Sequence, residues 1–163
     1  REEREFMRFD IVSDTHGYLS NELLSELEGA DVIVHAGDMC SESDFHTLNG
    51  IAITYMCKGN NDWGYAYDSY VTNLMRFFAA GLRWEVCHYR ERLDLATCEV
   101  AICGHTHRPF VERDAKTGAL VMNPGSPTFP RAGGPTIGRI IADNGKVQSA
   151  KIVPLRALDW QES

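Results

Sequence analysis

The sequence predicts an α/β protein built around a parallel β-sheet. In its first half, apolar runs rich in β-branched residues alternate with segments of helical spacing. This strand, helix, strand, helix, strand order implies right-handed crossovers, which place the strands parallel in one sheet. Each apolar run also ends in polar residues, at the position where open parallel sheets bind their ligands.

Residue patterns in the first half of the sequence predict five elements. In segment 20–29, Leu23, Leu24 and Leu27 have helical spacing and Gly29 ends the helix, while Asn-Gly ends a second short helix at residue 50. Strands are expected between and around these helices because the intervening runs are apolar and β-rich. The expected strands are 8–14, 31–38 and 51–60, and the expected helices are 20–29 and 41–50.

The second half is predicted to consist mainly of strands and turns. Two strands flank Ala80 and Gly81, and a further buried strand covers 98–105. A hairpin is expected over 110–123, followed by a Gly/Pro-rich loop over 123–135. Two last strands pair around Asn144 and Gly145.

Composition indicates one globular domain, expected at residues 7–163, with residues 1–6 an added or disordered segment before it. The net charge of -7 argues against binding to nucleic acid or to an anionic membrane surface as the main role. No apolar run approaches the roughly 20 residues that cross a bilayer. The odd number of cysteines, with no framework spacing, favours free thiols in the reducing cytoplasm: Cys40, Cys57, Cys87, Cys98 and Cys103.

The polar residues at the strand ends form a candidate metal site. His105 and His107 are two residues apart, so on an extended segment their side chains point the same way. Carboxylate, amide and imidazole donors suit manganese, with iron, zinc, nickel or magnesium as alternatives. The candidates are too many for one tetrahedral ion but suffice for two ions about 3.5–4 Å apart. They are Asp14, His16, Asp38, Asn60, His88, His105 and His107.

Two divalent cations at such a site suit phosphate esters. The cations neutralise the phosphate oxygens and lower the pKa of a shared water from about 15.7 toward 7, so that hydroxide can attack phosphorus. A bridging carboxylate such as Asp38 holds the two ions together against their mutual repulsion.

The motifs DTH, GD, GNND, a histidine after a strand and GHTH occur here in one order, followed by NPGS and PR. In this the chain resembles the calcineurin-like metallophosphoesterase superfamily over residues 7–153, and within it the small single-domain phosphodiesterases. The resemblance implies a four-layer αββα sandwich with a dimetal site at the strand ends. It also implies Asp14, His16 and His107 on the first metal, Asp38 as the bridge, and Asn60, His88 and His105 on the second.

The sequence departs from the family at two motifs. Asn61 stands where many relatives have a histidine that binds phosphate or assists the leaving group. Asn61 can hydrogen-bond a phosphoryl oxygen but cannot usefully donate a proton at neutral pH. Unless another acid is supplied, the expected substrates are therefore esters with good leaving groups, or diesters in preference to alkyl monoesters. His88 lacks the Gly-His that commonly follows it in relatives, and its connection to His105 has room for two helical turns at most.

Three further residues have two interpretations each. Asp62 either orients a ligand histidine or caps the following loop. Arg131 either contacts phosphate or is an ordinary surface residue, and His35 is either a core residue or a support for the ligands.

The predicted function is therefore metal-dependent hydrolysis of a small phosphate ester, most favourably a phosphodiester. The alternative is an interaction scaffold with weak or no catalysis, because the same fold resembles that of the small retromer subunit. A homo-oligomer is compatible with either prediction.

Overall fold

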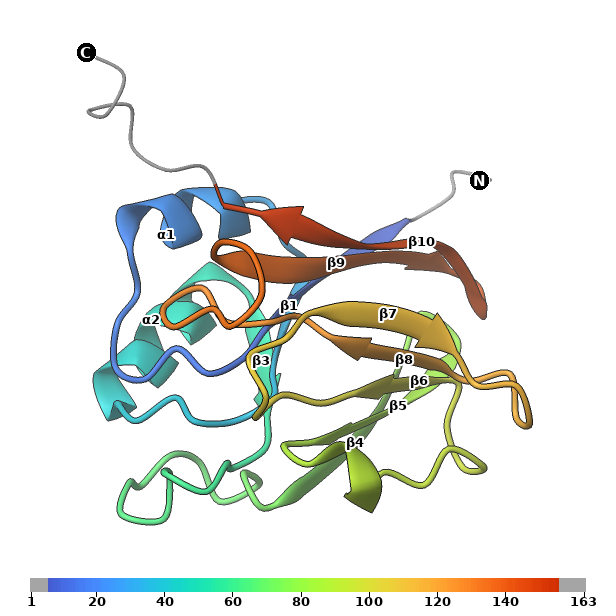
Figure 1. Ribbon diagram of the computed structural model, residues 1–163, viewed down its shortest axis with the longest axis horizontal. Coiled ribbons are helices and arrows are strands. Elements are labelled where there is room, and N and C mark those ends of the chain that lie inside the picture. The colour runs from blue at the N-terminus through green and yellow to red at the C-terminus, as the bar shows by residue number, and fades with distance from the viewer. Residues whose placement is uncertain (1–5, 156–163) are drawn as a thin grey trace.

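The computed structural model describes residues 6–155, and in this part of the chain two five-stranded sheets pack face to face (Figure 1). The predictions for residues 1–5 and for the last residues of the domain, 156–163, lie outside the described range. The first sheet has the order β10-β9-β1-β2-β3 and the second the order β4-β5-β6-β8-β7.

The elements follow the predicted order closely. The strands are β1 (Met7–Val12), β2 (Val32–His35), β3 (Ile53–Met56), β4 (Leu74–Ala79), β5 (Leu82–Cys87), β6 (Val100–Ile102), β7 (Phe110–Arg113), β8 (Leu120–Asn123), β9 (Thr136–Asp143) and β10 (Lys146–Pro154). The helices are α1 (Asn21–Leu27), α2 (Glu42–Ile51) and the 3₁₀ turn η1 (Arg90–Arg92).

The parallel arrangement of β1, β2 and β3 confirms the predicted crossovers. Ser20 and Ser41 begin the two crossover helices, because each side chain accepts a hydrogen bond from a first-turn N–H group. Alternate strand residues then face opposite sides: Ile11 packs between the sheets, whereas Ile33 packs on the helix side. Figure 1 shows α1 and α2 together on the outer face of this sheet.

Aromatic side chains fill part of the space between the sheets. Phe9 of β1 stacks on Trp84 of β5 with ring centroids 4.3 Å apart, and Phe77 stacks on the same indole at 5.4 Å. The buried residues of both inner faces form one apolar cluster around them. This packing joins the two sheets through their inner faces.

The outer layer of the second sheet is thinner than the αββα arrangement implies. The α/β sandwich is confirmed, but the outer face of β6 and β8 is covered by Leu93, Leu95 and Phe110, and the only helical turn that the described residues form between β5 and β6 is the short η1. The connection from Cys87 to Val100 is too short to carry a long crossover helix, in agreement with the sequence expectation. No helix in residues 6–155 is long and apolar enough to cross a membrane.

Candidate metal centre

Five loops meet where β1, β2, β3, β5 and β6 end. Backbone hydrogen bonds join them: Asp14 N–H donates to the Gly37 carbonyl at 2.9 Å, and His16 N–H donates to the Asp38 carbonyl at 3.0 Å. The N–H of Gly104 donates to the carbonyl of His88 at 3.1 Å. The predicted site residues therefore sit on loops that hold one another in place.

Most of the predicted ligands have left-handed backbones. Such a conformation is uncommon for residues other than glycine and costs on the order of 1–3 kcal/mol where it is strained. It occurs at Asp14, His16, Asp38, His105 and His107, with φ values of 57°, 52°, 61°, 73° and 61°. The left-handed backbones give these side chains directions that an extended strand would not.

Glycines let the loops approach one another. A Cβ atom on Gly104 would lie 2.1 Å from the Ser13 hydroxyl oxygen and 2.8 Å from Asp14 Oδ2. A Cβ atom on Gly59 would lie 2.2 Å from Asp38 Oδ1. Gly104 therefore lets the backbone pass close to the site, where any other residue would clash with Ser13 and Asp14.

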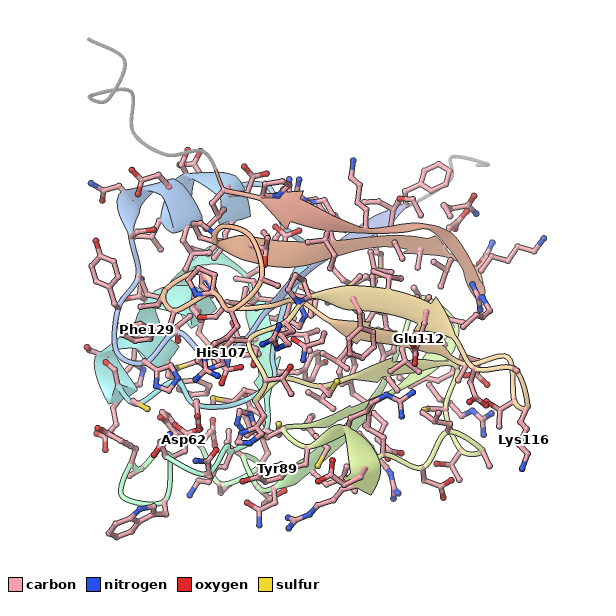
Figure 2. The ribbon with its side chains drawn as sticks, in the orientation of Figure 1. Asp62, Tyr89, His107, Glu112, Lys116 and Phe129 are labelled. Atoms are coloured by element: carbon pink, nitrogen blue, oxygen red, sulfur yellow. The ribbon has the colours of Figure 1, made fainter. Side chains whose placement is uncertain are left out.

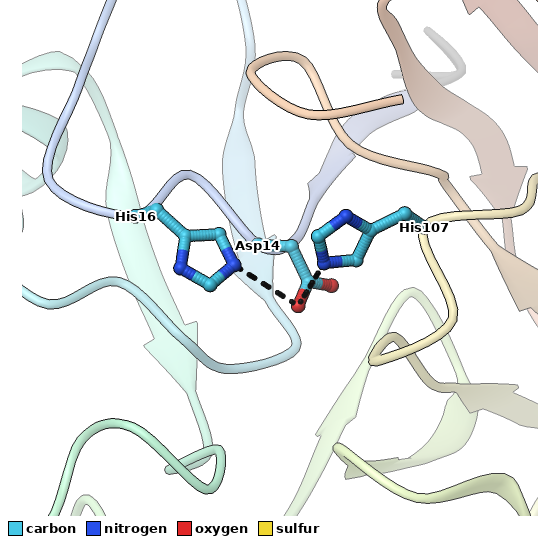
Figure 3. A group of neighbouring side chains, drawn as sticks. All are labelled: Asp14, His16 and His107. Atoms are coloured by element: carbon cyan, nitrogen blue, oxygen red, sulfur yellow. Dashed lines mark ion pairs between the residues drawn. The ribbon is translucent and has the colours of Figure 1, made fainter. Parts of the chain in front are cut away.

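The first group of donors consists of Asp14, His16 and His107 (Figure 3). Asp14 Oδ1 lies 3.2 Å from His107 Nε2 and 3.8 Å from His16 Nε2. Two nitrogen or oxygen ligands of one ion, each about 2.0–2.2 Å from it, are separated by roughly 3.0–3.5 Å. The 3.2 Å separation lies within this range and the 3.8 Å separation lies slightly beyond it, so the three side chains are close to the spacing that one cation requires.

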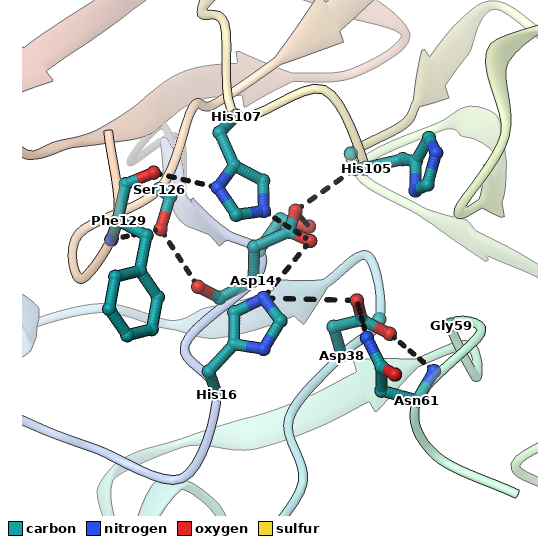
Figure 4. A network of polar contacts seen from close by, with 12 residues as sticks. Asp14, His16, Asp38, Gly59, Asn61, His105, His107, Ser126 and Phe129 are labelled. Carbon is teal, nitrogen blue, oxygen red and sulfur yellow. Dashed lines mark hydrogen bonds and ion pairs between the residues drawn. The ribbon is translucent and has the colours of Figure 1, made fainter. Parts of the chain in front are cut away.

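The second group shares Asp14 with the first and adds Asp38 and His88. His88 Nε2 lies 3.5 Å from Asp38 Oδ2 and 3.8 Å from Asp14 Oδ1. His16 Nε2 lies 3.8 Å from Asp38 Oδ2, so that the two groups are continuous (Figure 4). Two adjacent groups with shared carboxylates are the arrangement that a pair of ions requires.

Two backbone carbonyls determine which histidine nitrogen carries the proton. His88 Nδ1 lies 2.7 Å from the Ala36 carbonyl oxygen, and His107 Nδ1 lies 2.6 Å from that of Phe129. A carbonyl oxygen only accepts, so Nδ1–H is the donor in both rings. In the neutral histidines, Nε2 then directs a lone pair at the carboxylates, which is the form that binds metals.

Several buried atoms at this point have no hydrogen-bond partner among the described residues. They are Asp14 Oδ1, His16 Nε2 and His88 Nε2. Buried polar atoms are normally satisfied, and facing acceptor atoms repel each other unless a proton or a cation lies between them. The donor set and the unpartnered atoms both fit divalent cations.

The two aspartates titrate in opposite directions. Burial raises the pKa of Asp14 above its usual value. Burial also acts to raise the pKa of Asp38. The hydrogen bonds from His88 and Asn61 outweigh this effect, and the pKa of Asp38 falls well below its usual value. At His88, burial is outweighed by Asp38 and Asp14, and the pKa of the imidazole is raised.

The structure gathers five of the seven predicted ligands, and places the other two beside them. The ring of His105 is exposed and lies 5.1 Å from the His88 ring between centroids. Its backbone N–H donates to Asp14 Oδ2 at 3.0 Å. Asn60 is also exposed and shares a pocket with His88. The five gathered ligands are Asp14, His16, Asp38, His88 and His107.

The two predicted phosphate contacts lie at the rim. Asn61 donates to Asp38 through its backbone N–H at 2.9 Å and through its amide at 3.0 Å. The contact between Asn61 and Asp38 was not part of the sequence prediction. Arg131 donates its backbone N–H to the His107 carbonyl at 3.2 Å, and its side chain is exposed.

Asp62 does not orient a histidine, so that interpretation is wrong. Its buried carboxylate instead caps loop backbone, and the carbonyls of Ala36 and Phe129 orient the histidines. Those carbonyls are distant in sequence from the histidines that they orient, so the GNND motif could not show which groups orient the rings. The donors to Asp62 are the N–H groups of Asp38, Met39, Cys40 and Gly59 and the hydroxyl of Tyr67.

The NPGS loop and His35 support the site more than the sequence indicated. The hydroxyl of Ser126 donates to the Asp14 carbonyl at 2.8 Å, and the amide of Asn123 donates to the Gly104 carbonyl at 3.0 Å. His35 is fully buried, and its Nδ1 accepts the Gly37 N–H at 3.1 Å. No local pattern in the sequence reveals these long-range bonds.

The fold and the gathered donors define a class: an α/β sandwich with a candidate metal centre at its strand ends, as in metal-dependent phosphoesterases. The family model for the calcineurin-like phosphoesterase superfamily domain matches residues 7–145. The chain belongs to this superfamily, which confirms the family prediction and supports phosphoester hydrolysis as its chemistry.

Curated relatives and solved structures agree with this assignment. A probable metallophosphoesterase of Methanocaldococcus jannaschii is 29% identical over 91% of this chain and 82% of its own. One of Mycoplasma pneumoniae is 30% identical over 74% of this chain and 79% of its own.

Two solved structures show the same fold. Vacuolar protein sorting 29 of Cryptosporidium parvum has a TM-score of 0.73 at 16% identity, with 91% of this chain and 98% of that one covered. A novel archaeal phosphodiesterase has a TM-score of 0.71 at 23% identity, with 90% and 100% covered.

Proposed function

We propose that the chain is a phosphodiesterase that depends on two divalent metal ions, with manganese the preferred ion. The observation that supports this most directly is the convergence of unpartnered acceptor atoms on Asp14 and Asp38. Nitrogen and oxygen donors without a required thiolate suit manganese. In this proposal Asp14, His16 and His107 hold one ion, Asp38 bridges, and Asn60, His88 and His105 hold the other.

The bound ions would neutralise the phosphate and lower the pKa of water at the site. The protein itself would orient the phosphate. Asn61 donates its amide to Asp38 and can turn that amide to a phosphoryl oxygen. The backbone N–H of Arg131 donates to the His107 carbonyl, which places its exposed guanidinium near the first metal group. Hydrolysis joins a water oxygen to phosphorus, breaks one P–O ester bond and leaves a proton on the departing alcohol.

The preference for diesters follows from Asn61. An amide cannot give a proton to a leaving alcohol at neutral pH, so leaving groups that depart without help are favoured. All five cysteines are free thiols, which is compatible with the cytoplasmic location that we propose.

The first experiment measures metal content and turnover. Elemental analysis of untreated protein reports which ions bind and how many. With manganese, bis(p-nitrophenyl) phosphate should be hydrolysed faster than p-nitrophenyl phosphate, and His107→Ala should abolish turnover. His46→Ala is the matched control, because His46 is exposed on α2, and it should retain full activity.

The scaffold alternative is supported by the likeness in fold to vacuolar protein sorting 29. The two candidates differ in what the donor set must do. A complete site should turn over diester with manganese, whereas a scaffold should show no turnover with any divalent ion. Absence of turnover in the wild-type protein, with metal bound, would therefore favour the scaffold.

A further inference from the structure

A polar pocket adjoins the second half of the metal centre. Its volume is about 230 Å³, and it lies where β3 and β5 end. Asn60 and His88 form part of its wall, so the pocket adjoins the site itself. The lining residues are Lys58, Gly59, Asn60, Asn73, Cys87, His88, Tyr89 and Arg92.

The charge of this pocket is opposite to that of the chain. The net charge of the protein is -7, yet two of the eight lining residues are cations and none is acidic. Among the described residues, neither Lys58 nor Arg92 forms an ion pair with a carboxylate. By contrast, Arg90 donates to Glu112 at 2.6 Å only two residues before Arg92. The positive charge of the pocket is therefore available to a ligand.

Tyr89 positions one of these cations relative to the metal centre. The Arg92 guanidinium carbon lies over the Tyr89 ring, 4.8 Å from its centroid. The same ring packs against His105 at 4.7 Å and against His88 at 5.3 Å. Figure 2 shows Tyr89 on the side of the molecule where Asp62 and His107 lie, far from Lys116. A guanidinium held by its face keeps its N–H edges free for an anion.

We propose that this pocket binds a terminal phosphate monoester on the substrate, so that the preferred substrates are phosphodiesters carrying a second phosphate. The inference rests on the proposed phosphodiesterase function. A terminal phosphate is nearly a dianion, and the two cations of the pocket match its charge. Arginine binds phosphate through two parallel N–H donors and lysine binds it as a point charge. The scissile diester would lie at the metal centre and the second phosphate in the pocket.

The test compares two chromogenic diesters that differ only in the second phosphate. They are thymidine 3′-(p-nitrophenyl phosphate) and its 5′-phosphorylated form. With manganese, wild-type protein should prefer the 5′-phosphorylated ester in kcat/KM by roughly tenfold, since a charged hydrogen bond contributes about that factor or more. Arg92→Met and Lys58→Met should each lower this preference ratio, and the double variant should bring it close to one. Arg90→Met, the matched control, should leave the ratio unchanged.

Binding without turnover provides a second measurement. In excess chelator, calorimetry should show thymidine 5′-monophosphate binding to wild type and Arg90→Met, and roughly tenfold more weakly to Arg92→Met. Thymidine itself should show no difference among the three proteins.

The outcomes separate the two proposals. Hydrolysis of both esters at equal kcat/KM would overturn the pocket assignment and leave the phosphodiesterase intact. Equal binding of the monophosphate by wild type and Arg92→Met would also overturn the assignment. If neither ester is hydrolysed but the monophosphate discriminates between the variants, the phosphodiesterase fails and the anion pocket stands.

Discussion

Replacing Asp62 by asparagine tests how the loops of the metal centre are held. The Asp62 side chain is fully buried. Its Oδ2 accepts the backbone N–H groups of Asp38 at 2.6 Å and Gly59 at 2.8 Å. Its Oδ1 accepts three more hydrogen bonds, including one of 2.7 Å from the hydroxyl of Tyr67. Every donor around the carboxylate therefore needs an oxygen.

The expected loss can be worked out from this count. An asparagine must place its NH₂ group where one oxygen was, and the less costly choice is Oδ2, which faces two N–H donors. A hydrogen bond to a charged acceptor contributes about 1.5–3 kcal/mol, so Asp62→Asn should lower the free energy of unfolding by about 3–6 kcal/mol. That is a large part of the roughly 5–15 kcal/mol that stabilises an ordinary domain.

Urea unfolding measures this change. At an m-value of about 2 kcal/mol/M, the midpoint should fall by roughly 1.5–3 M with an unchanged slope. Asp68→Asn is the matched control, because Asp68 is exposed and should shift stability by no more than about 0.5 kcal/mol. Tyr67→Phe should fall between the two. Equal midpoints for Asp62→Asn and Asp68→Asn would refute the reasoning.

Three further predictions concern the same site. Gly104→Ala should weaken manganese binding measured by calorimetry, because its Cβ would meet Ser13 and Asp14; unchanged affinity would contradict this. Burial lowers the pKa of His35 to about 4 from 6.5. The unfolded chain therefore takes up that proton first, and acidification from pH 7 to 4 should cost on the order of 3 kcal/mol in urea unfolding. His35→Asn should remove this pH dependence of the unfolding free energy. If the variant and the wild type lose the same free energy between pH 7 and pH 4, the prediction is wrong.

The raised pKa of His88 has the opposite effect on the pH dependence of stability from the lowered pKa of His35. Its proton stabilises the metal-free fold below the unfolded pKa, and this contribution is lost as the pH rises through the folded pKa. A proton also competes with metal, so manganese should raise Tm more at pH 8 than at pH 6; an equal gain would count against His88 as a ligand.

Much of the fold could be predicted from local patterns. Apolar runs rich in β-branched residues identified β1 to β3, and glycine or Asn-Gly pairs identified where helices and hairpins end. The donor residues were also predictable in type, because polar side chains directly follow buried strands. The hairpin around Asn144 and Gly145 was predictable from its two turn residues, since both have the positive φ that such a turn requires.

The sequence by itself determined which residues stand at the strand ends, and therefore that carboxylates and imidazoles would gather there. Only the tertiary structure decided which nitrogen of each ring faces them. His88 is oriented by a carbonyl 52 residues away and His107 by one 22 residues away. The physical reason is that periodicity records short-range backbone preference, whereas these bonds depend on how distant loops pack. Tertiary packing also decided two further features, the thin layer over the second sheet and the cationic pocket beside His88.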